Sequence, residues 1–441
     1  MSDDAIFAGS IWSATAPAAP DTTQLKGDLQ CDVVVIGAGF TGLSCALHLA
    51  QAGVKVIVLE ANVIGHGASG RNNGQVIPTF SRVEPDAVPR MISAEAGGAR
   101  AGEALVKLVA DSARFTFDLI RKHQIDCEAV QNGWVQPAHS PGRMPLLEKR
   151  VRAWSRYGAP AEMLDARGVQ TVTGSSFWFG GWENATGGKL NPLAYARGLA
   201  RTAIHLGAQV FTHSPVLEVT RQGLTWQANT RNGAVRASRV VLATHAYTDR
   251  FTDALWPRLM QSVIPVRSYQ MATQVYSDDV RAQVLPEDHA CSDTQGDLHF
   301  FRWDNHNRLV TGGGLAIPLG WRTRITERIA ERVQKVFPQL GRPQFSHVWH
   351  GNVGVTPDRL PHCHEPAPGV FAFVGCNGRG VALSGAIGQE LARACTGTPI
   401  TDLAVPFTPL TPIFGHAIGR RVASLALLTY RRRDAREPVS P

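Results

Sequence analysis

Three glycines near the start of the chain have a spacing that suits contact with phosphates. Gly37, Gly39 and Gly42 form a G-x-G-x-x-G pattern. In this pattern the first glycine permits a tight turn, the second lets the backbone approach a pyrophosphate, and the third lets a helix pack closely on a strand. Glu60 follows eighteen residues after Gly42, where a carboxylate can accept hydrogen bonds from ribose hydroxyls. The four residues therefore predict a dinucleotide site.

The elements that would position these residues form a βαβ unit. Residues 33–36 are a continuous apolar run, typical of a parallel strand that is buried on both faces. A helical pattern begins at residue 43, and residues 54–59 form a second apolar run that ends at Glu60. The N-terminus of the predicted helix would offer free N–H groups and a partial positive charge to phosphates.

A loop of small and hydrogen-bonding residues follows Glu60, where an NAD-binding domain would normally continue with a helix and a strand. Residues 65–75 contain four glycines. Such a loop can follow the surface of a second, larger cofactor group, and the alternative is a flexible surface loop. The residues that we expect to contact the cofactor here are Ala61, Ser69, Arg71, Asn72, Asn73, Gly74 and Gln75.

Two stretches give the chain a resemblance to a known family. "VVVIGAGFTG" (33–42) with "GASGRNNGQ" (67–75), and "GVTPDRLP" (354–361) with "GCNGRG" (375–380), are similar to segments of the D-amino-acid-oxidase-like flavoproteins. That family includes glycine, sarcosine and γ-glutamylputrescine oxidases. The version in residues 67–75 is most similar to the γ-glutamylputrescine oxidase branch, and the similarity extends from about residue 9 to beyond residue 397.

The resemblance implies an α/β fold (α+β overall). A glutathione-reductase-type, Rossmann-like FAD-binding domain would be interleaved with a mainly antiparallel β-sheet substrate domain. The expected FAD-binding segments are 1–84, 143–250 and 345–402, and the expected substrate segments are 85–142 and 251–344. Residues 403–441 resemble a C-terminal extension. Val216 and Ala243 would lie beside the adenosine.

The second glycine-rich turn is expected to contact the flavin ring. An apolar strand at 370–374 leads through this turn into a helix from about 381 to 394, and the helix N-terminus can stabilise negative charge on a reduced ring. Arg379 is a candidate for a fixed positive charge that aids reduction of the flavin, and the alternative is a solvated loop residue. The residues expected at the cofactor are Gly378, Arg379, Gly380, Val381 and Ala382.

The resemblance also implies that FAD is bound without a covalent bond. Relatives that attach the flavin do so through a cysteine or a histidine at positions where this chain has Gly351 and Arg71. His66 and Cys376 are the other candidates for attachment. Sarcosine oxidases carry a lysine where this chain has Ala382, which makes a transfer of their oxidase behaviour less direct.

The implied activity is oxidation of an amine or amino acid. A hydride would pass from the carbon bearing nitrogen to flavin N5, the imine would hydrolyse, and O2 would reoxidise the flavin and give H2O2. Alternatives are a dehydrogenase that uses another acceptor, or a flavoprotein subunit of a larger oxidase. Arg302, on an aromatic segment at 300–303, is our candidate to bind a substrate carboxylate, and its alternative role is a structural ion pair.

Composition excludes other classes of protein. The 441 residues are 44% hydrophobic and 18% charged with a formal charge of +8, as in a globular protein of two or three domains. Arginines at 431–433 suggest a solvated end or contact with an anionic surface, and nucleic acid is not expected because no aromatic residues interleave with them. There is no signal-peptide pattern and no apolar run of the roughly 18 residues that a membrane span needs, so we expect a cytoplasmic protein.

The cysteine and histidine patterns predict neither disulfides nor a metal site. Seven cysteines are scattered without a C-x-x-C pair, which is typical of reduced thiols. The motif "PHCHEP" (361–366) places His362, Cys363 and His364 on a chain in which successive side chains point in different directions, and no second ligand cluster has zinc spacing.

Overall fold

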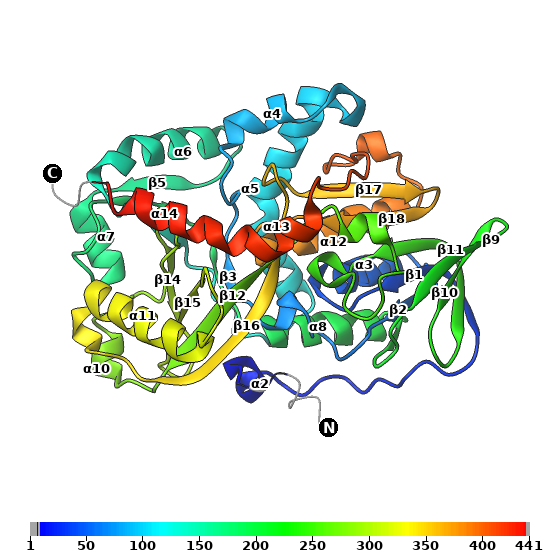
Figure 1. Ribbon diagram of the computed structural model, residues 1–441, viewed down its shortest axis with the longest axis horizontal. Helices are drawn as coiled ribbons and strands as arrows, with labels where there is room; N and C mark the ends of the chain where they lie inside the picture. Colours follow the sequence, from blue (N-terminus) through cyan, green and yellow to red (C-terminus); the bar gives the residue numbers. More distant parts are fainter. Residues whose placement is uncertain (1–6, 8, 438–441) are drawn as a thin grey trace.

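Two large β-sheets lie side by side in the computed structural model, which describes residue 7 and residues 9–437 (Figure 1). The first sheet has the strand order β17-β18-β11-β1-β2-β8, with a hairpin of β9 and β10 beside β11. Its strands are β1 (Leu29–Ile36), β2 (Val56–Leu59), β8 (Gln209–Phe211), β9 (Glu218–Gln222), β10 (Thr225–Asn229), β11 (Ala234–Leu242), β17 (His362–Ala367) and β18 (Val370–Val374).

The centre of the first sheet is the parallel, doubly covered structure that its apolar runs predict. β1 pairs in parallel with β2 on one side and with β11 on the other, and β18 pairs in parallel with β11. Every residue of β2 and of β18 is buried, as expected for strands with both faces covered. The carboxyl ends of these strands meet at one edge of the sheet, where ligands bind in open α/β folds.

A layer of helices covers one face of this sheet. α12 (Gly380–Cys395) packs against α3 (Phe40–Gln51) and α5 (Gly98–Lys122), and α3 also packs against α8 (Pro192–His205). The contact between α12 and α3 is close, because a Cβ added at Gly388 would lie only 2.7 Å from Ser44 Cβ. The Ser44 hydroxyl donates a 2.7 Å hydrogen bond to the Gly385 carbonyl across this contact.

The second sheet has the strand order β16-β12-β15-β14-β13-β4-β6-β5. All of its neighbours are antiparallel except the parallel pair β13 and β4. α11 (Trp321–Val336) packs against this sheet. The strands are β4 (Trp134–Pro137), β5 (Ala161–Leu164), β6 (Gly181–Asn184), β12 (Ile264–Thr273), β13 (Ala290–Ser292), β14 (Phe300–Trp303), β15 (Leu309–Gly313) and β16 (Phe345–Val355).

Strand pairing places several segments on the other side of the expected domain boundaries. β5 and β6 lie within 143–250 and β16 lies within 345–402, yet all three belong to the second sheet. α5 lies within 85–142 but packs on the helices of the first sheet. The reason is that pairing partners come from distant parts of the chain: β16 pairs with β12 along nearly its whole length and carries the chain back toward the first sheet.

The remaining elements are short or lie at the surface. β3 (Gln75–Val76) and β7 (Gly188–Lys189) form a small two-stranded sheet. No helix of the described residues is long and apolar enough to cross a membrane, and all seven cysteines are free thiols. The other helices are α2 (Ile11–Thr15), α4 (Val88–Met91), α6 (Met144–Arg156), α7 (Ala166–Thr173), α9 (Pro257–Met260), α10 (Asp278–Arg281), α13 (His416–Val422) and α14 (Ala426–Asp434).

Candidate functional site

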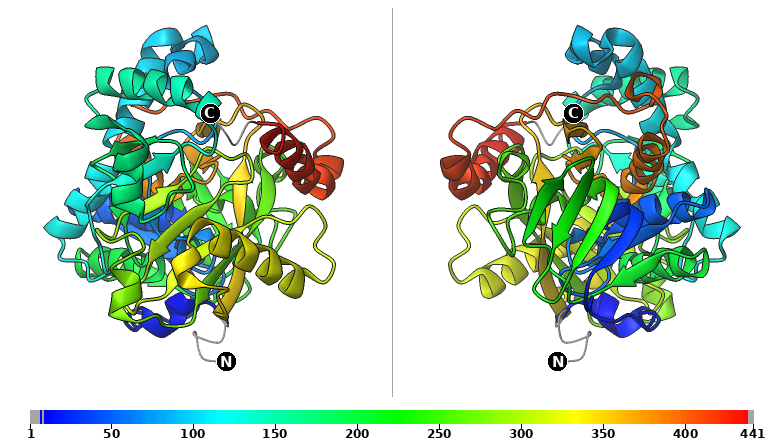
Figure 2. Two further views of the ribbon diagram at one scale, coloured as in Figure 1. Left: turned by 90° about the vertical axis from the view of Figure 1, so that its left-hand side faces the viewer. Right: turned by 90° about the vertical axis from the view of Figure 1, so that its right-hand side faces the viewer.

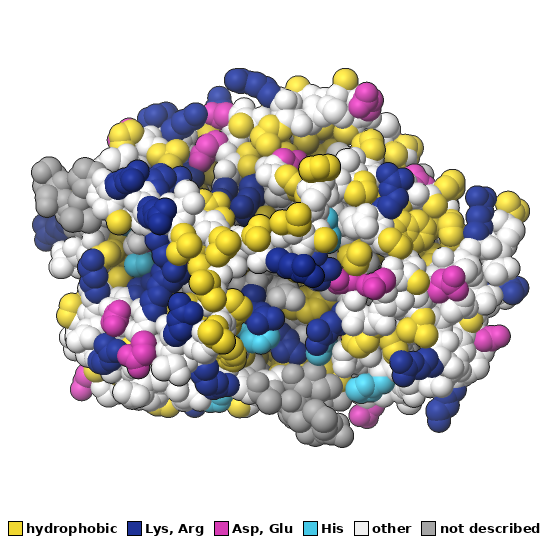
Figure 3. All heavy atoms as spheres, in the orientation of Figure 1, with side chains coloured by type: hydrophobic (Ala, Val, Ile, Leu, Met, Phe, Trp, Pro, Cys, Tyr) yellow, Lys and Arg dark blue, Asp and Glu magenta, His cyan; other side chains and the backbone are white. Residues whose placement is uncertain are grey.

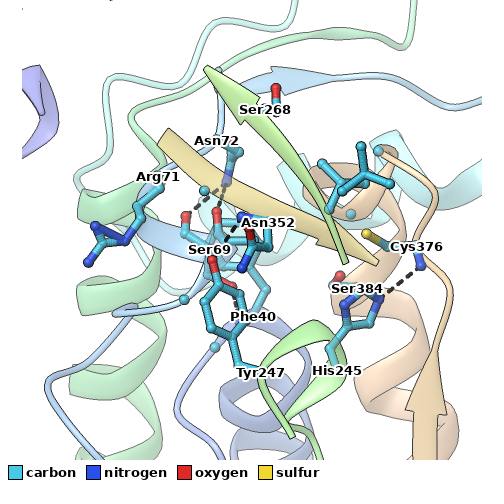
Figure 4. Close-up of a pocket in the computed structure, with 18 of the residues that line it drawn as sticks. Phe40, Ser69, Arg71, Asn72, His245, Tyr247, Ser268, Asn352, Cys376 and Ser384 are labelled. Atoms are coloured by element: carbon cyan, nitrogen blue, oxygen red, sulfur yellow. Dashed lines mark hydrogen bonds between the residues drawn. The ribbon is translucent and has the colours of Figure 1, made fainter. Parts of the chain in front are cut away.

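A cavity of about 430 Å³ is lined by residues of both sheets. One part is lined by the loops that follow β1, β2, β11 and β18, which leave the carboxyl edge of the first sheet. The other part is lined by residues of β12, β14 and β16 of the second sheet. Figure 4 shows side chains from both sheets converging on it.

The first glycine turn has the geometry that its spacing predicts. Gly37 has a positive φ of +109°, and a Cβ there would lie 2.9 Å from the Ala243 carbonyl oxygen. Gly39 is the N-cap of α3, and both glycines line the cavity. Gly42 lies behind them, where a Cβ would collide with the Gly37 carbonyl oxygen. A close backbone approach and a helix N-terminus without a capping side chain on Gly39 are therefore present together, as suits phosphate binding.

Glu60 follows β2 and lines the cavity beside Ala61. Its Oε2 accepts a 2.8 Å hydrogen bond from the Ala38 N–H, and its Oε1 accepts a 2.9 Å bond from the Asn62 N–H. Burial raises the pKa of the Glu60 carboxyl, and these backbone hydrogen bonds oppose the rise. Each oxygen retains a lone pair for a ligand hydroxyl.

The loop at 65–75 is ordered by its own side chains, so the alternative of a flexible loop is wrong. Asn72 Nδ2 donates to the carbonyls of Ala68 and Ser69, and Asn72 Oδ1 accepts a 2.7 Å bond from the Gly74 N–H. Ser69 Oγ accepts a 3.0 Å bond from the Phe40 N–H, which joins the loop to the start of α3 (Figure 4).

Two tryptophans hold this loop from behind. Trp12 Nε1 donates a 2.8 Å bond to the Asn72 carbonyl, and Trp349 Nε1 donates a 2.8 Å bond to the Arg71 carbonyl. The two indoles pack edge to face with ring centroids 5.9 Å apart. The short helix α2 thus supports the loop at 65–75, a role that the sequence of α2 alone does not indicate.

Arg302 does not line the cavity, contrary to the position expected for a substrate anchor. Its side chain is 1% exposed, its Nη1 donates a 2.7 Å bond to the Leu190 carbonyl, and its guanidinium lies 4.9 Å from the centre of the Trp12 ring. Nη1 also lies close behind Gly74. All four residues of β14 are buried, and Arg302 supports the loop at 65–75 from the side away from the cavity.

The second glycine turn is held by Asn377, whose Nδ2 donates to the carbonyls of Gly375 and Leu360 at 2.7 and 3.1 Å. Gly378 has a φ of +85°, a conformation that favours glycine. The predicted residues 378–381 all line the cavity at the N-terminus of α12. Ala382 does not: its side chain is buried in the helix layer, and its carbonyl accepts a bond from Thr116 Oγ1 of α5.

Arg379 is a buried cation at the cavity wall, so the reading as a solvated loop residue is wrong. Its side chain is 8% exposed, and it has no ion pair or side-chain hydrogen bond within residues 9–437. Burial, with Arg150 and Arg82 nearby, lowers the pKa of Arg379 to about 9. Its guanidinium lies 5.8 Å from the centre of the Trp134 ring, which attracts a cation more weakly than a counter-ion does. A buried charge without a counter-ion is costly, and an anion in the cavity would offset that cost.

Several cavity residues were not among those expected from the sequence. Among them are His245 and Tyr247, which follow β11 and lie near Cys376, a residue already named as a candidate for flavin attachment (Figure 4). The Cys376 N–H donates a 3.0 Å bond to His245 Nε2, and the Asn352 N–H donates a 2.9 Å bond to Tyr247 Oη. The signal that would have found the first two is their place just beyond a parallel strand, next to Ala243.

Both remaining candidates for flavin attachment, His66 and Cys376, line the cavity. Burial lowers the pKa of His66 to about 4. Burial by itself raises the pKa of the Cys376 thiol, but His245 and the hydrogen bonds around the sulfur bring it below its usual value. Gly351 also lines the cavity.

Buried polar atoms without partners show that the cavity fits a polar ligand such as FAD. Among the buried polar atoms without partners in the described structure, those on cavity residues are both side-chain amide atoms of Asn73, Oε1 of Gln75, Oε1 of Gln270 and Nε of Arg379. All four residues line the cavity. Buried polar groups normally have hydrogen-bond partners, so these atoms, with the two glycine turns, form a suitable surface for the cofactor. Val216 and Ala243 line it as well.

The end of the cavity at the second sheet has apolar side chains beside polar ones, which include Arg267, Ser268 and Asp297. Leu298 and Phe300 line it, and Leu427 of α14 reaches it from the C-terminal segment. A Cβ added at Gly314 would lie 2.6 Å from Leu427 Cδ1. Gln270 and Arg379 contribute the polar groups listed above, so this end suits a ligand with both apolar and polar parts.

The histidines at 361–366 lie outside the cavity and have protein partners. His362 Nε2 is 3.0 Å from the Asp358 carboxylate, and His364 Nδ1 is 2.8 Å from the Thr408 carbonyl oxygen. Cys363, between them, is fully buried. These contacts explain the residues as parts of the strand β17 and its neighbours.

Comparison with known proteins shows the family to which the chain belongs. The family model described as DAO, FAD dependent oxidoreductase, matches residues 32–394. Gamma-glutamylputrescine oxidoreductase from Escherichia coli is 29% identical over 389 residues, covering 88% of this chain and 89% of the relative. A probable oxidoreductase OrdL from Haemophilus influenzae is 30% identical over 380 residues, covering 86% and 85%.

Solved structures agree with the expected fold class. An L-amino acid deaminase from Proteus vulgaris has a TM-score of 0.71 at 18% identity, covering 89% of this chain and 95% of that chain. Glycine oxidase from Geobacillus kaustophilus has a TM-score of 0.69 at 20% identity, covering 84% and 96%. At sequence identities this low, the similarity to these structures supports the fold alone. The family match covers most of the sequence, and the chain belongs to the family of FAD dependent oxidoreductases.

Proposed function

We propose that this protein oxidises a C–N bond of an amine or amino acid, with FAD as its cofactor and O2 as the acceptor. The observation that carries the proposal is the single cavity that joins the phosphate-binding turn of the first sheet to a partly apolar end at the second sheet, with Arg379 between. The relatives named gamma-glutamylputrescine oxidoreductase and glycine oxidase support an amine or amino acid as the substrate class.

Residues of the first sheet would hold the cofactor. Gly37, Gly39 and the N-terminus of α3 suit its phosphates, and the Glu60 carboxylate suits its ribose. The loop at 69–75 and the turn at 378–381 would contact the rest of the molecule. When bound, FAD supplies an acceptor for the hydride that leaves the carbon next to the amine nitrogen, and O2 then takes these two electrons as H2O2.

The protein's share of the reaction is positioning, charge and exclusion of water. Gln270 Oε1, which is buried without a partner, is placed to accept an N–H of the amine. The Arg379 guanidinium favours negative charge on whatever lies beside it, either a reduced ring or a substrate carboxylate. Leu298, Phe300 and Leu427 keep water from the end at the second sheet. The imine product would then hydrolyse in water to a carbonyl compound.

A γ-glutamyl amine fits this arrangement, because it carries an amine to be oxidised and a carboxylate that suits Arg379. The experiment mixes the yellow holoprotein with polyamines, γ-glutamyl amines and N-methyl amino acids in the absence of O2. We expect at least one class to bleach the flavin, and we expect peroxide when air is admitted. If no amine bleaches the flavin, the proposal is wrong. Bleaching followed by slow reoxidation in air would instead indicate a dehydrogenase with another acceptor.

A further inference from the structure

The outer face of the C-terminal segment, residues 413–437, carries a row of exposed apolar side chains. Phe414 is fully exposed, Ile418 is 68% exposed, and Val422, Leu425 and Leu428 are 42–44% exposed. Their spacing of three or four residues places them on one side of α13, the turn after it and α14. Figure 2 shows these helices, in red, on the outside of the molecule in both views.

This exposure is fixed, because the inner face of the segment is bound to the rest of the molecule. His416 Nε2 is 3.0 Å from the Val263 carbonyl oxygen, and Ser424 Oγ donates a 2.9 Å bond to the Ala316 carbonyl. Arg431 Nε donates a 2.9 Å bond to the Asp297 carboxylate. The segment therefore cannot turn its apolar row inward without breaking these contacts.

Arginines flank the apolar row. Arg420 pairs with Asp249, whereas Arg421, Arg432, Arg433 and Arg436 have no ion pair within residues 9–437. The two acidic residues of the segment are already used: Asp434 accepts a 2.9 Å bond from the Gly296 N–H, and Glu437 pairs with Arg143. In Figure 3 hydrophobic side chains run along this face with Lys and Arg side chains beside them.

A neighbouring loop extends the apolar surface. Ile317 is 53% exposed and Leu319 is 81% exposed, and both follow Ala316, which is bonded to Ser424 of the segment. Arg324 Nη1 donates to the carbonyls of both residues at 3.0 and 3.2 Å, which orders the loop. The exposed apolar surface thus consists of the C-terminal segment and the loop of Ile317 and Leu319, and the arginines of the segment lie beside it.

We propose that this face docks on an anionic membrane surface. Helices that lie in the plane of a membrane present an apolar face to the acyl boundary and arginines to the headgroups, and unpaired cations complement anionic lipids. A second copy of this chain is a poorer occupant, since an isologous contact would bring the same unpaired arginines together. Leu427, which lines the cavity, lies between exposed Leu425 and Leu428, so docking would place the substrate end of the cavity close to the lipid.

The test is co-sedimentation of the holoprotein with vesicles of phosphatidylglycerol and phosphatidylcholine, and with vesicles of phosphatidylcholine alone. We expect the holoprotein to bind the anionic vesicles, and we expect this binding to weaken at high salt. Binding to the neutral vesicles should be at least tenfold weaker. Ile418→Glu/Leu425→Glu and Arg421→Glu/Arg432→Glu should each reduce binding at least tenfold. The matched control is Leu224→Glu, because Leu224 is 93% exposed at the turn between β9 and β10, far from the segment in sequence.

The FAD content of each variant shows whether it has folded. The proposal is overturned if the unchanged holoprotein does not bind anionic vesicles at low salt, or if Leu224→Glu weakens binding as much as the segment variants do. It is also overturned if the unchanged protein is a dimer by size exclusion and Ile418→Glu/Leu425→Glu makes it a monomer, because the apolar row would then cover a second copy.

Discussion

At the scale of single residues, Arg379 combines burial with the lack of an ion pair in the described structure, where its guanidinium faces only the Trp134 ring, and the two together indicate function. Folded proteins seldom keep a buried cation unpaired, because its removal from water is not compensated. The side chain nevertheless lines the cavity. The cost is therefore present in the protein without ligand, and binding of an anionic group removes it.

Removal of the Arg379 charge should therefore raise the stability of the apoprotein and lower the activity of the enzyme. Arg379→Met keeps the volume and removes the charge, so we expect the protein without FAD to be more stable by about 1–3 kcal/mol. The rate of flavin reduction by the substrate should fall at least tenfold, and Arg379→Lys should restore part of it. Thermal unfolding of the apoprotein and anaerobic stopped-flow absorbance measure the two effects. A loss of stability in Arg379→Met would contradict the assignment.

Glu60 has a double role that the sequence pattern predicts only in part. It faces the cavity, as expected for a ribose contact, and it also fixes the turn through the Ala38 N–H. Charge-assisted hydrogen bonds contribute about 1.5–3 kcal/mol each. We therefore expect Glu60→Ala to weaken FAD binding at least tenfold, and Glu60→Gln to weaken it less. Fluorescence titration of the apoprotein with FAD measures both variants, and an unchanged affinity in folded Glu60→Ala would exclude the ribose contact.

At the scale of elements, α14 forms an outer wall of the cavity at the second sheet. Two adjacent leucines of this helix face in different directions. Leu427 lines the cavity, whereas Leu428 is 42% exposed. One methylene group more or less in an apolar pocket changes selectivity by about 10–200-fold. Leu427→Ala should therefore shift the preference toward bulkier amines at least tenfold, and Leu428→Ala should leave it unchanged.

The measurement is kcat/KM for a series of amines of increasing size, with both leucine variants assayed beside the unchanged protein. The ratio of kcat/KM between the largest and smallest amines isolates the shape of the pocket from general losses of activity. If Leu427→Ala and Leu428→Ala have equal ratios, α14 does not contact the substrate.

The elements that could be predicted from sequence are those whose signals are local. β1, α3 and β2 follow directly from apolar runs, helical periodicity and the glycine spacing, and so does the passage from β18 through the second turn into α12. The pairing of β5, β6 and β16 in the second sheet depends on partners far along the chain, and a strand's own sequence does not name its partner.

Side-chain direction set a second limit on prediction. Arg302 was correctly placed on a strand of the second sheet, but its guanidinium contacts Trp12 and the Leu190 carbonyl on the side away from the cavity. Residues two apart on a strand share a face, and Phe300 on this face does line the cavity. Arg302 lies two residues farther along β14, so the face of the strand alone does not decide whether a side chain enters the site. His245 and Tyr247 lie in the site because of where β11 ends, not because of a motif.

At the scale of the whole molecule, the cavity is a joint between the two sheets, and a cofactor in it would contact both. Gln75 shows the connection, since its Nε2 donates to the Cys291 and Phe301 carbonyls of the second sheet while its Oε1 is without a partner. The chain also crosses between the sheets several times. Ligand binding should therefore stabilise the molecule as one unit.

Removal of FAD tests this coupling and the absence of a covalent bond together. We expect acid precipitation to leave the yellow colour in the supernatant, because the chain has Gly351 and Arg71 at the positions where the family resemblance implies attachment through a cysteine or a histidine. A ligand that binds only the folded state stabilises it by about 2.7 kcal/mol at a hundredfold excess over Kd, so FAD added to the apoprotein should raise Tm by several degrees in a concentration-dependent way. Both sheets should unfold in a single transition in the holoprotein, because the cofactor contacts both.

Colour that stays in the pellet would instead indicate a bond to Cys376 or His66. A Tm that does not respond to added FAD would show that the folded apoprotein does not bind FAD.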